Sequence, residues 1–137
     1  MGEKITVYIH VDATMDKVWE TWTTPNHIMK WNAASPDWHT TKAENDLRVG
    51  GKFSFRMEAK DASFGFDFEG DYDQVKIHEL IEYTMADGRK CIIQFVQQEN
   101  AIQINQTFDA ENENPIEAQQ FGWQSILNNF KMYVEQN

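Results

Sequence analysis

Short segments in which apolar and polar side chains alternate dominate this sequence. In the first of them, residues 4–11, the side chains of Ile5, Val7, Ile9 and Val11 fall on one face, as in a half-buried β-strand. Similar segments occupy residues 52–58, 64–72, 80–85, 91–96 and 102–108. Because turn-forming residues separate most of these later segments at short intervals, we expect them to pair as antiparallel hairpins.

Two short helices and one long helix complete the pattern. Thr14 is placed to cap a helix that ends near residue 23, and Thr24 followed by Pro25 begins a second short helix. Residues 117–135 repeat apolar side chains every three or four positions and predict one long helix. Gly122 lies inside it and indicates close packing against another backbone. Residues 32–45 follow neither repeat and are expected to form a loop.

This order of elements predicts an α+β fold, in which a curved antiparallel sheet of five or six strands follows the first strand and its two helices. The long helix would bury its apolar stripe on the concave face of the sheet. The chain has 137 residues, of which 41% are apolar, and both values are typical of one globular domain. We therefore expect a single domain over residues 1–137.

The charge balance excludes several classes of partner. Twenty-two acidic and 12 basic residues give a net charge of −10, which argues against binding to nucleic acid or insertion into an anionic membrane. The single cysteine, Cys91, suits a reducing compartment, and without a signal peptide or membrane span we expect a cytoplasmic protein. Asp67, Glu69 and Asp71 are spaced by two and are expected to face solvent. We expect no cofactor and no metal, because no metal-site spacing connects the four histidines, His10, His27, His39 and His78.

Several motifs resemble those of a known superfamily. They are residues 9–13 (IHVDA), 17–19 (KVW), 22–25 (WTTP), 48–53 (RVGGKF), 68–70 (FEG) and 122–123 (GW), with Trp31 and Leu127. The N-terminal motifs resemble the START-like helix-grip (SRPBCC) superfamily. The later ones are similar to its branch named after the activator of the heat-shock chaperone ATPase, whose C-terminal domain has this fold. The resemblance implies a six- or seven-stranded antiparallel sheet gripped by a long C-terminal helix around a cavity, and superfamily members that bind lipids, sterols or polyketides.

The inward positions of the expected strands and C-terminal helix supply candidate walls for such a cavity. They are Phe53, Phe55, Met57, Phe66, Phe68, Phe95, Ile104, Trp123, Leu127 and Phe130. The polar side chains of Tyr72, Tyr83 and Gln106 are also expected to point inward, where they either orient a ligand or satisfy one another. Trp31 and Trp38 are expected at the mouth, in a loop that gates entry. The alternative is a filled core, since large aromatic side chains serve either purpose.

We predict that the domain binds a small hydrophobic molecule, lipid-like or aromatic, non-covalently beneath the C-terminal helix. One alternative is a protein-interaction module related to the chaperone ATPase activators of the stress response, with a protein such as a chaperone as its partner. A second is an enzyme of the polyketide-cyclase type, which would need an acid–base group inside the cavity. The sequence offers only Tyr72, Tyr83 or His39 for that role, so we expect binding without catalysis, by a monomer or weak dimer.

Overall fold

A computed structural model of the chain describes residues 3–136. Within this range seven strands form one antiparallel sheet in the order β1-β7-β6-β5-β4-β3-β2, accompanied by three helices. The elements are β1 (Lys4–Val11), α1 (Met15–Thr23), α2 (Pro25–Trp31), β2 (Trp38–Asn45), β3 (Lys52–Ala59), β4 (Gly65–Lys76), β5 (Leu80–Met85), β6 (Lys90–Gln97), β7 (Ile102–Asp109) and α3 (Ile116–Gln136). The predicted α+β helix-grip architecture is confirmed.

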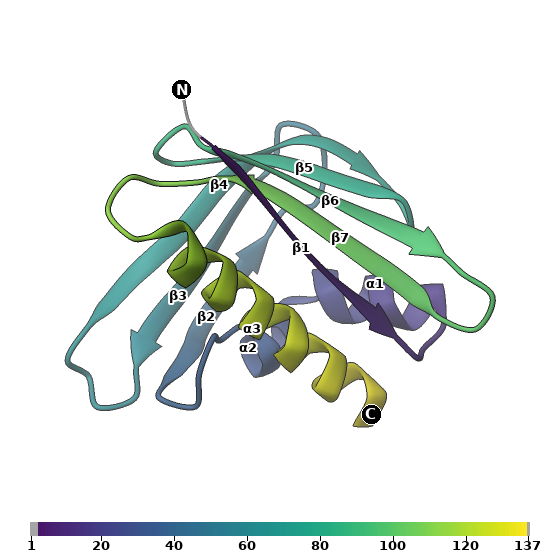
Figure 1. Cartoon of the computed structure of the whole chain (residues 1–137), viewed down its shortest axis with the longest axis horizontal. Helices are drawn as coiled ribbons and strands as arrows, with labels where there is room; N and C mark the ends of the chain where they lie inside the picture. Colours follow the sequence, from purple (N-terminus) through teal and green to yellow (C-terminus); the bar gives the residue numbers. More distant parts are fainter. Residues whose placement is uncertain (1–2, 137) are drawn as a thin grey trace.

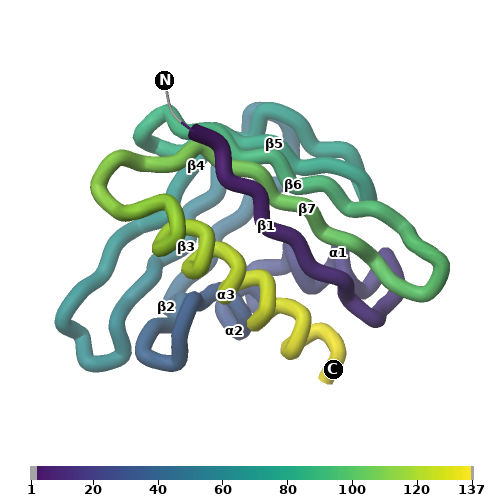
Figure 2. The backbone as a smooth tube through the Cα atoms, viewed as in Figure 1, coloured from purple at the N-terminus to yellow at the C-terminus, as the bar shows by residue number. Residues whose placement is uncertain are grey.

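The sheet curves around α3, which crosses its concave side, while α1 and α2 lie at one end of the sheet (Figure 1). The same arrangement is visible in the backbone trace, where the N-terminal strand runs beside β7 (Figure 2). Alternation along β1 places Ile5, Val7, Ile9 and Val11 in the core. The expected stripe of α3 meets them there, and Phe130 is fully buried. The two periodicities of the sequence, two and 3.6, therefore converge on one core.

Close backbone contact occurs at Gly70 on β4. A Cβ atom at this position would lie 2.7 Å from the ring of Phe53 and 2.7 Å from the carbonyl oxygen of Thr84. Glycine therefore allows the Phe53 ring to approach the backbone of β4 closely, in the region where β3, β4 and β5 pair. Phe53 is also one of the residues that line the cavity described below.

Three expectations about local structure are wrong. Residues 38–45 form the edge strand β2, which pairs with β3, and not a loop. An edge strand with one solvated face needs few apolar residues, and here Thr40 fills a buried position by donating a hydrogen bond to the carbonyl oxygen of Asn32 at 2.6 Å. β4 also continues past Tyr72 to Lys76 through a register shift. A Cβ at Gly122 would meet none of the described atoms within 4 Å, so close backbone packing does not explain that glycine.

The convex face of the sheet is polar and charged. The expected solvent-facing positions Asp67, Glu69 and Asp71 are exposed, and the Asp71 carboxylate accepts a hydrogen bond from Lys52 Nζ at 2.6 Å. Among the described helices, none is both long and apolar enough to span a bilayer. Within residues 3–136 no three His, Cys, Asp or Glu side chains are grouped so that they could hold a metal ion.

Candidate ligand-binding cavity

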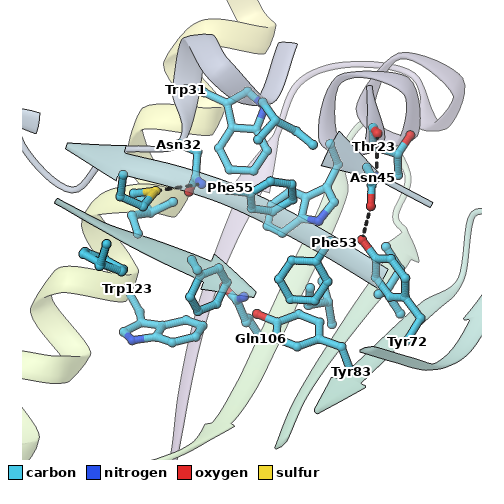
Figure 3. Close-up of a pocket in the computed structure, with 18 residues that line it drawn as sticks. Thr23, Trp31, Asn32, Asn45, Phe53, Phe55, Tyr72, Tyr83, Gln106 and Trp123 are labelled. Carbon is cyan, nitrogen blue, oxygen red and sulfur yellow. Dashed lines mark hydrogen bonds between the residues drawn. The ribbon is translucent and has the colours of Figure 1, made fainter. Parts of the chain in front are cut away.

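A cavity of about 190 Å³ lies between the concave face of the sheet, α3 and the two short helices (Figure 3). Its lining consists of Trp22, Thr23, Ile28, Trp31, Asn32, Asn45, Phe53, Phe55, Met57, Phe66, Phe68, Tyr72, Ile81, Tyr83, Ile93, Gln106, Trp123 and Ile126. A dry apolar cavity of about 150 Å³ is large enough to take up benzene. The volume here therefore suits a compact body of one or two rings.

Phe53 organises the sheet side of the cavity. Its ring centroid lies 4.8 Å from that of Tyr83, 5.2 Å from Phe55 and 5.3 Å from Tyr72. Phe68 continues the group at 5.6 Å from Phe53. Tilted and edge-to-face contacts of this kind hold aromatic rings in fixed orientations. The rings are therefore kept as walls of the cavity.

A second aromatic group closes the helix side. The indole rings of Trp22 and Trp31 lie 4.9 Å apart, and the Trp31 Nε1–H donates to the carbonyl oxygen of Thr21 at 2.9 Å. Trp31 is only 4% exposed. The expectation of a gating loop is therefore corrected: Trp31 is a fixed wall on α2, and Trp38 lies on β2.

The cavity opens between the β3–β4 hairpin and α3. Five apolar lining side chains there remain partly accessible to solvent: Phe55, Phe66, Phe68, Trp123 and Ile126. Phe66 is 49% exposed, because the hairpin that carries it extends beyond the helix. Among the lining residues on β5 and β6, Ile81 and Ile93 are each 2% exposed and Tyr83 is 6% exposed. The lining is therefore most accessible at Phe66 and closed at the β5–β6 end.

Ten of the fifteen expected site residues surround this cavity. They are Trp31, Phe53, Phe55, Met57, Phe66, Phe68, Tyr72, Tyr83, Gln106 and Trp123. The structure places the other five outside the lining. Phe95 packs against Trp19 with ring centroids 5.2 Å apart; Ile104, Leu127 and Phe130 are fully buried in the core. Trp38 contacts Phe66, at a centroid distance of 6.0 Å, and faces a separate open groove that His39 also lines.

Eight lining residues were not anticipated. They are Trp22, Thr23, Ile28, Asn32, Asn45, Ile81, Ile93 and Ile126. The inward positions on the expected strands and helices would have identified Ile81, Ile93 and Ile126. The sequence held no signal for Asn45, because it fell in the segment expected to be a loop.

Most polar groups of the lining are already engaged with one another. The Tyr72 hydroxyl donates to Asn45 Oδ1, and Asn45 Nδ2 donates to the carbonyl oxygen of Thr23 at 2.8 Å (Figure 3). Asn32 Nδ2 donates to Met57 Sδ at 3.4 Å. These contacts fix the ends of α1 and α2 to the sheet. At that end of the cavity Asn45 Oδ1 is occupied, whereas Asn32 Oδ1 accepts no hydrogen bond from the described residues.

The cavity is electrically neutral. None of the described lining residues is an acid, a base or a histidine, and burial raises the pKa of Tyr83 well above its ordinary value. Burial also raises the pKa of Tyr72, which outweighs the hydrogen bond to Asn45. Both tyrosines therefore keep their protons at neutral pH. An ion inside this space would lose its hydration without gaining a partner, so the site favours an uncharged ligand.

These raised pKa values predict a loss of stability in alkali. Burial raises the pKa of the Cys91 thiol from about 9 to about 11, and raises that of Tyr83 well above its ordinary value of about 10. The unfolded chain releases these protons at a lower pH than the folded chain, so the stabilisation is complete below about pH 9 and is lost progressively above it. Urea unfolding midpoints should be level from pH 7 to 8.5 and fall towards pH 11. The decline should be shallower in Tyr83→Phe; an equally steep decline there would contradict this assignment.

The family described as activator of Hsp90 ATPase homolog 1-like protein matches residues 12–135 of the chain. The solved AHSA1-like protein of Aeromonas hydrophila is 44% identical, with a TM-score of 0.92, and the match covers 98% of this chain and 93% of that one. A protein of Cytophaga hutchinsonii is 54% identical, with a TM-score of 0.85 and the same coverage. A Chromobacterium violaceum protein, 22% identical over 98% of this chain and 99% of its own, shares the fold with a TM-score of 0.88. No curated protein matches the sequence.

Proposed function

Since this chain belongs to the activator of Hsp90 ATPase homolog 1-like family, and a fold alone does not determine function, we propose from its site that it binds a small, uncharged, largely apolar molecule. Binding is non-covalent and takes place in the cavity between the sheet and α3. The observation that carries the proposal is the lining itself. It combines about 190 Å³ of space with fixed aromatic walls and no charged side chain among the described residues.

The energetics favour a ligand of modest size. Burial of roughly 250 Å² of apolar ligand surface would contribute about 6 kcal/mol before the costs of association. A preformed wall lowers those costs, because few side chains have to be ordered when the ligand enters. We therefore expect dissociation constants in the micromolar to millimolar range for ligands of one or two rings. Sterol-sized molecules exceed the volume of the cavity as it stands.

We propose that the domain binds its ligand without catalysing a reaction, because the cavity lining offers no suitable acid–base group. General acid–base catalysis needs a group that exchanges protons near the working pH, and Tyr72 and Tyr83 hold theirs too tightly. His39 lies outside the cavity lining. A cytosolic setting fits as well, since Cys91 is a free, buried thiol.

The tryptophans provide a direct test. Trp22, Trp31 and Trp123 line the cavity, whereas Trp19 and Trp38 do not. Titration with naphthalene, followed through the indole N–H signals in ¹H–¹⁵N spectra, should shift the first three signals and leave Trp38 unchanged. Equal shifts of all five signals would indicate nonspecific association. An absence of shifts at the solubility limit of naphthalene would refute the proposal.

A protein-interaction module is the second candidate. It is favoured by two exposed aromatic side chains, Phe64 on the β3–β4 turn and Phe121 on α3, which are 73% and 75% exposed. Exposed aromatic groups of this size are common anchors in protein interfaces. A chain that ignores every apolar probe, yet loses capture of a protein from its source organism in the double variant Phe64→Ala, Phe121→Ala, would favour this candidate.

A further inference from the structure

Among the described lining residues, Gln106 and Asn32 have a side-chain amide oxygen that accepts no hydrogen bond. Gln106 lines the cavity from β7 and is 6% exposed. Its Nε2 group donates to Cys91 Sγ at 3.5 Å, which is a long contact to a weak acceptor. Within residues 3–136, its Oε1 oxygen accepts no hydrogen bond. Because the described residues contain no fully buried side-chain nitrogen or oxygen without a hydrogen-bond partner, this oxygen is open to the space of the cavity.

The surroundings do not supply that missing donor. Cys91, with a pKa raised to about 11 by burial, is a neutral thiol, and its neighbour Tyr83 interacts with the same sulfur. Figure 3 shows the Gln106 and Tyr83 side chains together on the sheet side of the cavity. The Asn45 amide is engaged with Tyr72 and Thr23 instead. Of the two amide oxygens in the described lining that accept no hydrogen bond, that of Asn32 lies at the end of α2, whereas that of Gln106 lies on the sheet side among the aromatic rings.

From this geometry we propose that the ligand carries a hydrogen-bond donor, a hydroxyl or an N–H, and donates it to the Gln106 side chain. The inference rests on the proposed function and narrows it to uncharged one- or two-ring molecules with a single donor group. Such a ligand satisfies the amide oxygen and places its apolar body against Phe53, Phe68 and Trp123. Gln106 would then determine specificity, because a buried polar group discriminates strongly against analogues that leave it unpaired.

Matched pairs of probes test this role. 2-Naphthol and naphthalene differ by one hydroxyl, and indole and indene differ by one N–H group. In the wild-type chain, 2-naphthol should bind roughly five- to tenfold more tightly than naphthalene, and indole more tightly than indene by a similar factor. This is the gain expected from one hydrogen bond to a group that an apolar ligand would leave unpaired. 2-Methoxynaphthalene, which can accept but not donate, should bind no better than naphthalene.

The variant Gln106→Leu keeps a similar side-chain volume and removes the acceptor. We expect the preference for 2-naphthol over naphthalene to fall to about one, while naphthalene still shifts the Trp22, Trp31 and Trp123 signals. The control is Gln103→Leu on the same strand, whose side chain hydrogen-bonds Asn105 and lies outside the lining; it should retain the full preference. A urea unfolding curve for each variant confirms that it is folded.

The outcomes separate this inference from the proposed function. If naphthalene and 2-naphthol both bind with equal affinity to the wild-type chain, the cavity binds ligands but Gln106 does not select among them. If the Gln106→Leu variant still prefers 2-naphthol over naphthalene, the inference is also overturned, because another group then accepts the hydrogen bond. If neither probe shifts the cavity tryptophans, the proposed function fails, and the role of Gln106 fails with it.

Discussion

Replacement of Phe130 by alanine should lower the free energy of unfolding by about 3–5 kcal/mol. The Phe130 side chain is fully buried, and its ring lies 5.0 Å from Trp22 and 4.9 Å from Trp31 in edge-to-face contacts. It therefore joins α3 to both short helices beneath the sheet. Truncation removes apolar burial and leaves a void that the two rigid indoles cannot fill. Domains of this size are stable by only about 5–15 kcal/mol, so the loss should be large in a urea titration.

The matched control for this change lies on the same helix. Phe121 is 75% exposed, and Phe121→Ala should alter stability by no more than about 0.5 kcal/mol. The two variants remove the same atoms from one helix, so they differ only in what surrounds the ring. A loss below about 1 kcal/mol in Phe130→Ala would mean that the core relaxes around α3, and that α3 is not held by this residue.

A tryptophan at position 126 should block the cavity. Ile126 lines it from α3 and is half-buried near the opening, so an indole there can extend into the space without displacing the core. We expect the affinity for naphthalene and for 2-naphthol to fall at least tenfold in Ile126→Trp, because the volume of about 190 Å³ leaves no room for both groups. Stability should change by about 1 kcal/mol or less, since the side chain has access to solvent.

Position 92 supplies the control for this substitution. Ile92 lies on β6 beside the lining residue Ile93 but points to the opposite face of the sheet, where it is 38% exposed. Ile92→Trp should therefore bind both probes as the wild-type chain does. Isothermal titration calorimetry of the two variants shows whether the probes bind inside the cavity or elsewhere. Unchanged affinity in a folded Ile126→Trp would place the bound probe outside this cavity.

Agreement between sequence and structure is closest where a single repeat governs a whole element. The alternation over residues 4–11 matches β1, and the bounds of β5 are those expected, Leu80–Met85. The expected Thr14 cap is present, with its side chain accepting from the Lys17 N–H at 3.2 Å. In each case local side-chain chemistry and burial point to the same conformation, so the pattern is visible without knowledge of the rest of the chain.

Strand β2 is an element that such local patterns do not predict. Its sequence, WHTTKAEN, has no apolar alternation, and it becomes a strand because β3 offers it hydrogen-bonding partners along one edge. Pairing of β2 with β3 also gives Asn45 and Trp38 contacts that a loop would not predict. Asn45 becomes the partner of Tyr72, and Trp38 contacts Phe66 from the edge of the sheet. Pairing between segments distant in sequence decides such cases, and local propensity is a weak guide to it.

By itself, the sequence determined the α+β class, the placement of the long helix against the sheet, and which side chains of β1 and of the long helix face inward. These properties follow from periodicity, which depends only on neighbouring residues. Only the tertiary structure decided which inward residues line open space and which fill the core. Phe95 and Phe53 share the same pattern, yet α1 covers Phe95 with Trp19, while Phe53 remains against the cavity. The difference arises from how the helices pack across the sheet, which periodicity within one segment does not encode.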